Sequence, residues 1–307
     1  EKLIETTDNT PVPLSIDATI GISSEITSRS LVTGDTFPAS SDIGIFVTGD
    51  GYTPKVTIYT YEESAWSLKP TEPAQSPIYL TKNEATVYGF YPVIEPLTSQ
   101  PITANTSDKT IPVTIASSYS GFTVPESQAD YLYAKDASDG SKMAEVTKSA
   151  ATASLKFYHA LSQLSFIVNK AEDFGGTGNL TSLSVTAASS NITGTGTLKL
   201  DGTGITLSGS PSKSITMTGS VIINAYNTTP SSNVIAKALV APFATAQNVT
   251  LNMTIDGQDY TGTINDVTWT AGSNHVYTVT VGGGTLTISP VSIKDWIKVD
   301  SENVIVD

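Results

Sequence analysis

The chain lacks several features that would narrow its function. It has no cysteine, and its 16 basic residues against 29 acidic ones give a net charge of −13. Proteins that bind nucleic acids or dock electrostatically on acidic membranes need patches of lysine and arginine, so the composition argues against both classes. No run of 18 apolar residues occurs, which argues against a membrane-spanning helix in these 307 residues. The absence of cysteine leaves the compartment open, because a large exported fold does not need disulfides.

The residues that are abundant indicate a β-rich protein. Hydrophobic residues make up 39% of the 307-residue chain, which is enough for real cores and for two domains of ordinary size. Thr, Ser, Gly and Asn are frequent and long helical patterns are scarce, a profile typical of an all-β extracellular protein. The sequence begins at Glu1 without a methionine or a signal peptide, so we expect either a processed or a shortened form.

The most regular pattern lies between residues 12 and 22. Alternate residues are apolar, and those between them are polar, small or turn-forming. Successive side chains of a strand point to opposite faces, so the pattern predicts one long strand with a dry face and a wet face. A polar stretch with Arg29, the only arginine, follows, and we interpret the strand as a removable plug, although an ordinary first strand would alternate in the same way. The predicted plug residues are Val12, Leu14, Ile16, Ala18, Ile20 and Ile22.

Short alternating runs separated by Gly and Pro continue through the chain and predict the strands of a sandwich or barrel. Residues 134–154 are charged and rich in Ala and Ser, so we place a domain boundary near residue 150. The expected domains are residues 1–150, which include the removable strand at about residues 10–29, and residues 151–307. A short helix over residues 143–153 is a further expectation.

Two details of the second half can be predicted from local patterns. Asp201-Gly202 and Asp256-Gly257 separate alternating runs and are good hairpin turns. The apolar residues of 155–161 and of 164–168 alternate out of phase by one residue. A β-bulge near Ser162-Gln163 would restore the phase and bend the strand.

A search for catalytic or metal-binding motifs finds no signal. There is no His-Glu-x-x-His run, Cys/His cluster, nucleophile elbow or phosphate loop. His159 alternates in phase with apolar neighbours and is expected in the core, whereas His275 is expected at the surface, in a turn before a strand. Three aromatic residues, Tyr52, Tyr119 and Phe122, would suit either a sugar-binding platform or ordinary packing. We predict no catalytic residue, no metal site and no cofactor.

Three segments of the second half resemble the fimbrillin family. The first is Phe157-Tyr-His-Ala-Leu-Ser-Gln-Leu-Ser-Phe166, which is similar to the strand that opens the family's second domain. Ala238-Leu-Val-Ala-Pro-Phe243 is similar to the segment ahead of its last strands. The third is the series from Trp269 through Tyr277 to Trp296. The resemblance is specific over residues 155–296 and depends on strand rhythm and the position of Arg29 in the first half.

The resemblance implies a structural subunit of a type V pilus that is exported as a lipoprotein to the outer membrane. It implies two β-sandwich domains of transthyretin-like Greek-key topology, and an arginine-specific protease that cuts between Arg29 and Ser30. The vacated groove would accept a strand from the C-terminal part of the next subunit, which makes other pilus subunits the expected partners and host or bacterial surface ligands further candidates. The candidate donor residues on this chain are Leu286, Ile288, Val291, Ile293, Val304 and Val306.

Two other functions remain open at this point. A surface lipoprotein that binds glycans through a β-sandwich would need an exposed aromatic platform. A β-sandwich hydrolase would need two acidic side chains about 5–10 Å apart in a cleft.

Overall fold

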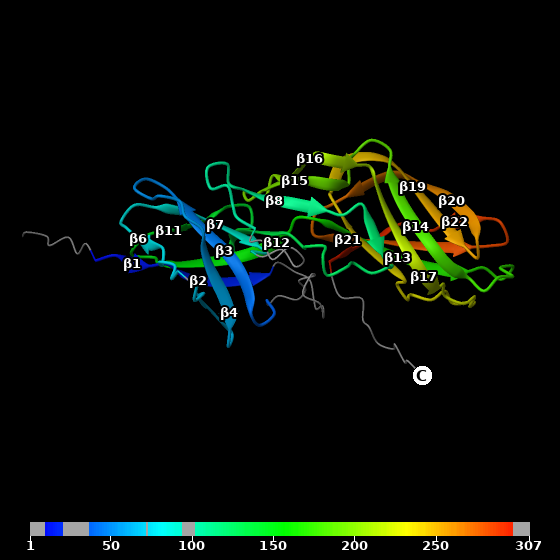
Figure 1. The fold of residues 1–307 in the computed structure, drawn as a ribbon, viewed down its shortest axis with the longest axis horizontal. Helices are drawn as coiled ribbons and strands as arrows, with labels where there is room; N and C mark the ends of the chain where they lie inside the picture. Colours follow the sequence, from blue (N-terminus) through cyan, green and yellow to red (C-terminus); the bar gives the residue numbers. More distant parts are fainter. Residues whose placement is uncertain (1–9, 21–36, 72, 94–101, 297–307) are drawn as a thin grey trace, which may run out of the picture.

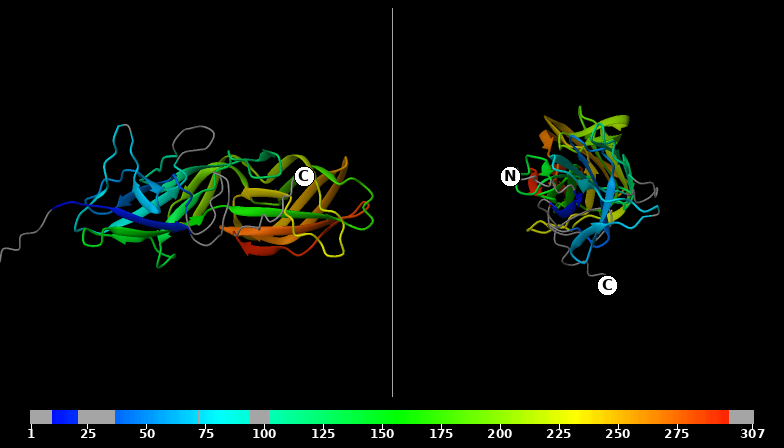
Figure 2. Two further views of the ribbon diagram at one scale, coloured as in Figure 1. Left: turned by 90° about the horizontal axis from the view of Figure 1, so that it is seen from below. Right: turned by 90° about the vertical axis from the view of Figure 1, so that its left-hand side faces the viewer.

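The computed structural model describes residues 10–20, 37–71, 73–93 and 102–296. All the secondary-structure elements in these ranges are β-strands, so the all-β prediction is confirmed (Figure 1). The described ranges accordingly hold no helix that is long and apolar enough to cross a membrane. The molecule is elongated, with the strands gathered in two lobes along its length (Figures 1 and 2).

The first lobe is built on an eight-stranded sheet. Its order is β2-β12-β10-β7-β3-β4-β5, with β11 also paired to β7. A two-stranded pair, β1 with β6, lies beside it. The strands are β1 (Val12–Pro13), β2 (Ser15–Ile20), β3 (Ser41–Thr48), β4 (Thr57–Glu62), β5 (Ala65–Leu68), β6 (Tyr79–Leu80), β7 (Ala85–Tyr91), β10 (Leu132–Asp136), β11 (Ala144–Val146) and β12 (Thr152–His159).

This sheet curls until its two edges approach each other. The indole N–H of Trp66 on β5 donates to the carbonyl oxygen of Ala18 on β2, at 3.1 Å, although the two strands are at opposite ends of the sheet order. Apolar side chains from β2, β3, β4, β7, β10, β11 and β12 fill the concave side and form one core. Alternation in the sequence therefore directs one set of side chains from each strand into this core.

The second lobe consists of two sheets packed face to face over the largest core cluster. One has the order β18-β13-β21-β22, with β23 also paired to β21, and the other has the order β20-β19-β14-β17-β9. Two packed layers of this kind are consistent with a β-sandwich, while the transthyretin-like connectivity stays a prediction. The strands are β9 (Ser118–Ser120), β13 (Ser162–Lys170), β14 (Asn179–Ala187), β17 (Ser214–Ile222), β18 (Ala236–Val240), β19 (Phe243–Ile255), β20 (Gln258–Trp269), β21 (Ser273–Val281), β22 (Leu286–Ile288) and β23 (Ser292–Asp295).

A three-stranded sheet connects the two halves of the sequence. It consists of β8 (Thr110–Ile115), β15 (Thr193–Lys199) and β16 (Gly204–Ser212). A third core cluster forms where β8 and β15 meet the outer face of β3 and β7, and it includes Phe46, Phe90 and Trp296. The junction between the lobes is therefore apolar and built from both halves of the chain.

Both predicted Asp-Gly turns join paired strands. β19 and β20 are connected by Asp256 and Gly257, whose φ angles of 50° and 78° are those of a tight turn in which both central residues are left-handed. The Asp256 carboxylate also accepts hydrogen bonds from the amides of Gly178 and Asn179, at 2.7 and 2.9 Å, which lower its pKa. Asp201-Gly202 likewise lies between β15 and β16.

Two local predictions were wrong. No bulge restores the phase near Ser162-Gln163, because β12 ends at His159 and β13 starts at Ser162 in a different sheet. The change of phase therefore marks a crossing between sheets at residues 160–161. Residues 143–153 form no helix either, since β11 pairs with β7 and β12 begins at Thr152, so pairing with the sheet overrides local composition.

Candidate functional site

The predicted plug is an edge strand of the first lobe. Leu14, Ile16, Ala18 and Ile20 are buried in its core, and the residues between them on β2 are exposed, as the alternation predicts. Val12 is only half-buried, because it belongs to the short strand β1, which pairs with β6 instead of continuing β2. The predicted plug residue Ile22 and the predicted cleavage residues Arg29 and Ser30 lie outside the described residues.

Within the described residues, β2 has one backbone ladder, and it is parallel, whereas the preceding Val12 and Pro13 pair antiparallel with β6. All six residues of β2 pair with β12, from Ser15 opposite Thr152 to Ile20 opposite Phe157. The strand that holds β2 in the sheet therefore comes more than 130 residues later in the sequence. It runs lengthwise along the molecule beside β12 (Figures 1 and 2).

The other edge of the plug strand is held by two side chains and by one backbone hydrogen bond, from the amide of Leu14 to the carbonyl oxygen of Ile78 at 2.8 Å. The hydroxyl of Tyr59 on β4 donates to the carbonyl oxygen of Leu14 at 3.2 Å, and the indole of Trp66 donates to that of Ala18. Burial raises the pKa of Tyr59 to about 12, so the phenol keeps its proton at neutral pH. Trp66 is packed edge-on against Phe37, with ring centroids 5.0 Å apart. Sequence reasoning missed both residues, because no local pattern distinguishes a tyrosine that fills a core from one that binds a carbonyl.

The candidate donor segment is only partly buried in this structure. Leu286 and Ile288 on β22, together with Val291, pack at the margin of the second-lobe core. Ile293 on β23 is 61% exposed. The remaining candidate donor residues, Val304 and Val306, lie outside the described residues.

Gly262 on β20 provides the space that the β22 side chains occupy. A Cβ atom at this position would stand 2.6 Å from Leu286 Cδ2 and 2.8 Å from Ile288 Cδ1. Both distances are far shorter than a van der Waals contact between carbon atoms. A side chain at residue 262 would therefore force the Leu286 and Ile288 side chains out of their present positions without changing the donor sequence.

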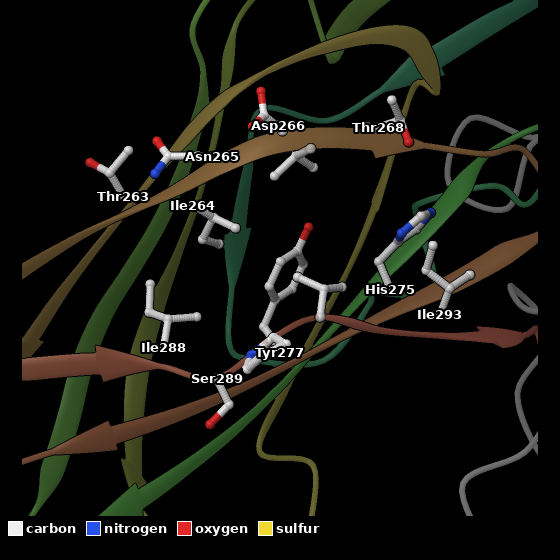
Figure 3. Close-up of a pocket in the computed structure, with 13 residues that line it drawn as sticks. Thr263, Ile264, Asn265, Asp266, Thr268, His275, Tyr277, Ile288, Ser289 and Ile293 are labelled. Carbon is white, nitrogen blue, oxygen red and sulfur yellow. The ribbon is translucent and has the colours of Figure 1, made fainter.

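A surface pocket of about 420 Å³, distinct from the groove that the plug fills, lies in the second lobe between the edge strand β20 and the β22–β23 segment (Figure 3). Its walls include Ile264 and Val267 on one side and Ile288, Val291 and Ile293 on the other. The prediction that His275 is a surface turn residue was wrong, since it lies in β21 beside this surface pocket and is 1% exposed. Its Nε2 accepts the amide N–H of Thr270 at 3.1 Å, and burial lowers its pKa to about 4.

The last described residue, Trp296, is anchored at the junction of the lobes. Its ring stacks on the imidazole of His159, with centroids 4.3 Å apart and an interplanar angle of 13°. His159 Nδ1 lies 2.8 Å from Asp130 Oδ2, and all three side chains are at most 2% exposed. The prediction of a core position for His159 is therefore confirmed. β12 accordingly contacts the plug along its length and, through its last residue His159, contacts Trp296 within the candidate donor segment.

The structure offers no support for the sugar platform that the sequence left open. Tyr119 and Phe122 are buried, and Tyr52 is half-buried with its hydroxyl donating to the carbonyl oxygen of Asn83 at 3.0 Å. These three residues are therefore packing residues. Within the described ranges, no three His, Asp or Glu side chains gather in a way that could hold a metal ion.

Solved structures with a similar fold are fimbrial and cell adhesion proteins. A proposed cell adhesion protein from Bacteroides ovatus aligns with a TM-score of 0.63 and 18% identity, over 95% of this chain and 100% of that one. A second, from Bacteroides uniformis, gives 0.58 and 18% over 92% and 98%. A fimbrial protein from Bacteroides vulgatus gives 0.53 and 14% over 94% and 100%. At these identities the likeness shows a shared fold.

The family follows from the sequence itself. A model of fimbrillin-like proteins matches residues 29–296, which is most of the chain. None of the curated proteins matches it in sequence. The chain belongs to the fimbrillin-like family, a family of fimbrial proteins, and the resemblance found in residues 155–296 is confirmed.

Proposed function

We propose that the protein is a structural fimbrial subunit that polymerises by strand exchange after proteolysis. The observation that carries this proposal is the plug strand β2. It fills a core with alternate side chains, yet in the part of the chain that the structure describes a backbone ladder joins it to the sheet along one edge, that facing β12. A strand held in this way can leave as a unit and be replaced by another strand with the same alternation.

The energetics favour a stable plug that becomes replaceable once cut. Burying a leucine or isoleucine side chain contributes about 1.5–3 kcal/mol, so Leu14, Ile16 and Ile20 together contribute on the order of 5–9 kcal/mol, an upper estimate. While the chain is intact, this strand is tethered to its groove at a high effective concentration that an outside strand does not match. After cleavage between Arg29 and Ser30 the tether is lost, and an incoming strand can compete.

The incoming strand would come from the C-terminal segment of another copy or of another pilus subunit. Leu286 and Ile288 alternate as the groove requires, and so do Val291 and Ile293, and Val304 and Val306 near the end of the sequence. Partial burial of β22 and the exposure of Ile293 are consistent with a segment that can leave its own subunit. Because the groove and the donor are different surfaces, each added subunit presents a new groove, and the assembly grows as a fibre.

The remaining features of the proposal follow the family. We propose two domains that meet at residues 160–161, where the chain crosses between sheets, close to the boundary expected near residue 150. We further propose export as a lipoprotein to the outer membrane, processing by an arginine-specific protease, and a structural and adhesive role at the cell surface without enzymatic activity. The fimbrillin-like family membership supports the surface location and assembly with other subunits.

Controlled cleavage tests the proposed function. The full chain is treated with an arginine-specific protease, and its size is followed by gel filtration and electron microscopy. We expect the wild type to form fibres, and Arg29→Lys, which retains the positive charge but is not a substrate, to stay monomeric. Fibres of the uncut Arg29→Lys chain would overturn the mechanism. Deletion of residues 297–307 distinguishes the two parts of the candidate donor segment. If fibres still grow after this deletion, the donor strand lies within residues 284–296.

A further inference from the structure

On its second edge, the backbone of the plug strand is bound at Leu14 by the carbonyl oxygen of Ile78 and, at two of its own carbonyl oxygens, by side chains. On a strand, the carbonyl groups of residues four apart point to the same side and lie about 13 Å from each other. Leu14 and Ala18 have this spacing, and their carbonyl oxygens receive the hydroxyl of Tyr59 and the indole N–H of Trp66. Every amino acid has a backbone carbonyl, so neither donor depends on the side chains of the strand it binds.

Both donors are positioned by parts of the molecule that remain when the plug leaves. Tyr59 lies in the middle of β4 and is 4% exposed. The Trp66 ring packs against Phe37 at 5.0 Å and against Tyr61 at 5.1 Å, measured between ring centroids. Phe37 follows Arg29 in the sequence and therefore stays with the body of the protein after cleavage there.

An empty groove would leave these donors without their acceptors. A buried polar group that loses its partner destabilises the protein, and replacing the lost carbonyl by that of another strand removes this cost. The two donors thus favour occupation of the groove by any strand whose alternating face fits the core. A neutral hydrogen bond contributes about 0.5–1.5 kcal/mol, which corresponds to about twofold to twelvefold in affinity for each donor.

We propose that Tyr59 and Trp66 form a main-chain clasp that first holds the plug and then binds the backbone carbonyls of the replacing strand from a second copy of this chain. The inference rests on the proposed strand exchange, and it assigns the positioning of the strand to two named side chains. The clasp fixes the position of the bound strand along the groove. The core determines which apolar side chains the bound strand can have. It explains how one groove serves two strands of different sequence.

Three conservative variants of the full chain test the clasp. Tyr59→Phe and Trp66→Phe each remove one donor and retain an aromatic ring, and Tyr61→Phe is the matched control. Tyr61 lies on the same strand as Tyr59 and contacts Trp66, but it makes no hydrogen bond to β2 within the described residues. In the uncut chain, we expect hydrogen exchange of the β2 amides to be about threefold to tenfold faster in the first two variants than in the control.

The same variants are then cut after Arg29, separated from the released N-terminal fragment, and titrated with two synthetic peptides, residues 10–22 and residues 284–307. We expect the affinity for both peptides to fall about threefold to tenfold relative to Tyr61→Phe. Exchange rates and affinities equal to the control would overturn the clasp while leaving strand exchange in place. If the cut wild type binds the first peptide but not the second, strand exchange with this donor fails, and binding of the first peptide still decides whether the clasp exists. Tyr59→Phe retains every carbon atom of the side chain. If Trp66→Phe does not fold, Tyr59→Phe alone therefore decides the test.

Discussion

Truncating a single plug side chain, Ile20→Ala, would measure how strongly the plug is bound. Ile20 is 2% exposed, belongs to the first-lobe core and lies opposite Phe157 in the ladder with β12. Replacing a buried isoleucine by alanine costs about 2–4 kcal/mol, because transfer free energy is lost and a cavity remains. The neighbouring Thr19 is exposed on the other face of the strand, so Thr19→Ala should change stability by no more than about 0.5 kcal/mol.

The same free energy should appear in two assays. Urea unfolding of the uncut chain should show Ile20→Ala destabilised by about 2–4 kcal/mol relative to Thr19→Ala. After cleavage at Arg29 the plug is attached by noncovalent contacts alone, and the same difference corresponds to a dissociation constant about 30- to 1,000-fold higher. Gel filtration of the cut protein at decreasing concentration would report the release of the N-terminal fragment.

Two results would refute the reasoning. Equal stability of Ile20→Ala and Thr19→Ala would show that β2 is not packed as described. A large loss of stability in the uncut chain without faster release after the cut would show that the strand does not leave as a unit.

Three further predictions concern the rest of the molecule. Gly262→Val should loosen the packing of Leu286 and Ile288 against β20 and so accelerate fibre growth of the cut protein in a light-scattering assay, with the donor sequence unchanged. Gly44→Ala would place a Cβ within about 3 Å of the Phe90 ring and should destabilise the chain by about 1–3 kcal/mol in thermal unfolding. Gly175→Ala, with no atom within 4 Å, should change little. His275 has its pKa lowered from 6.5 to about 4, so the unfolded chain binds the proton more tightly. Its contribution to stability should be complete above pH 6.5 and fall as the pH drops towards 4, and urea unfolding of His275→Gln should show a shallower pH dependence in this window.

The sequence could predict which face of a strand is buried, but not which strand is its neighbour. Alternation identified Leu14, Ile16, Ala18 and Ile20 as core residues because the period of two is a property of the strand itself. The Asp-Gly turns were predictable because their backbone angles depend on adjacent residues. The parallel pairing of β2 with β12 depends on the fold of the whole chain, and no local sequence pattern predicts it.

Residues that act across the fold were missed for the same reason. Tyr59 and Trp66 become a pair only when the sheet curls and brings β4 and β5 to the plug. His275 was misplaced because β21 begins two residues before it, so a position that seemed to belong to a turn lies within a buried strand. Gly262 shows its role only in the distances to the β22 side chains.

The orientation of the β2–β12 ladder has a mechanical consequence. Both strands run along the long axis of the molecule, and their parallel ladder has evenly spaced hydrogen bonds (Figure 1). A pull along that axis loads the strand in shear, so the bonds share the tension and must break together. A sideways pull instead peels the strand from one end and breaks the bonds one at a time. We therefore expect a strand in this groove to resist lengthwise stretching far better than bending, which would give a chain of subunits linked by the proposed strand exchange tensile strength together with lateral compliance.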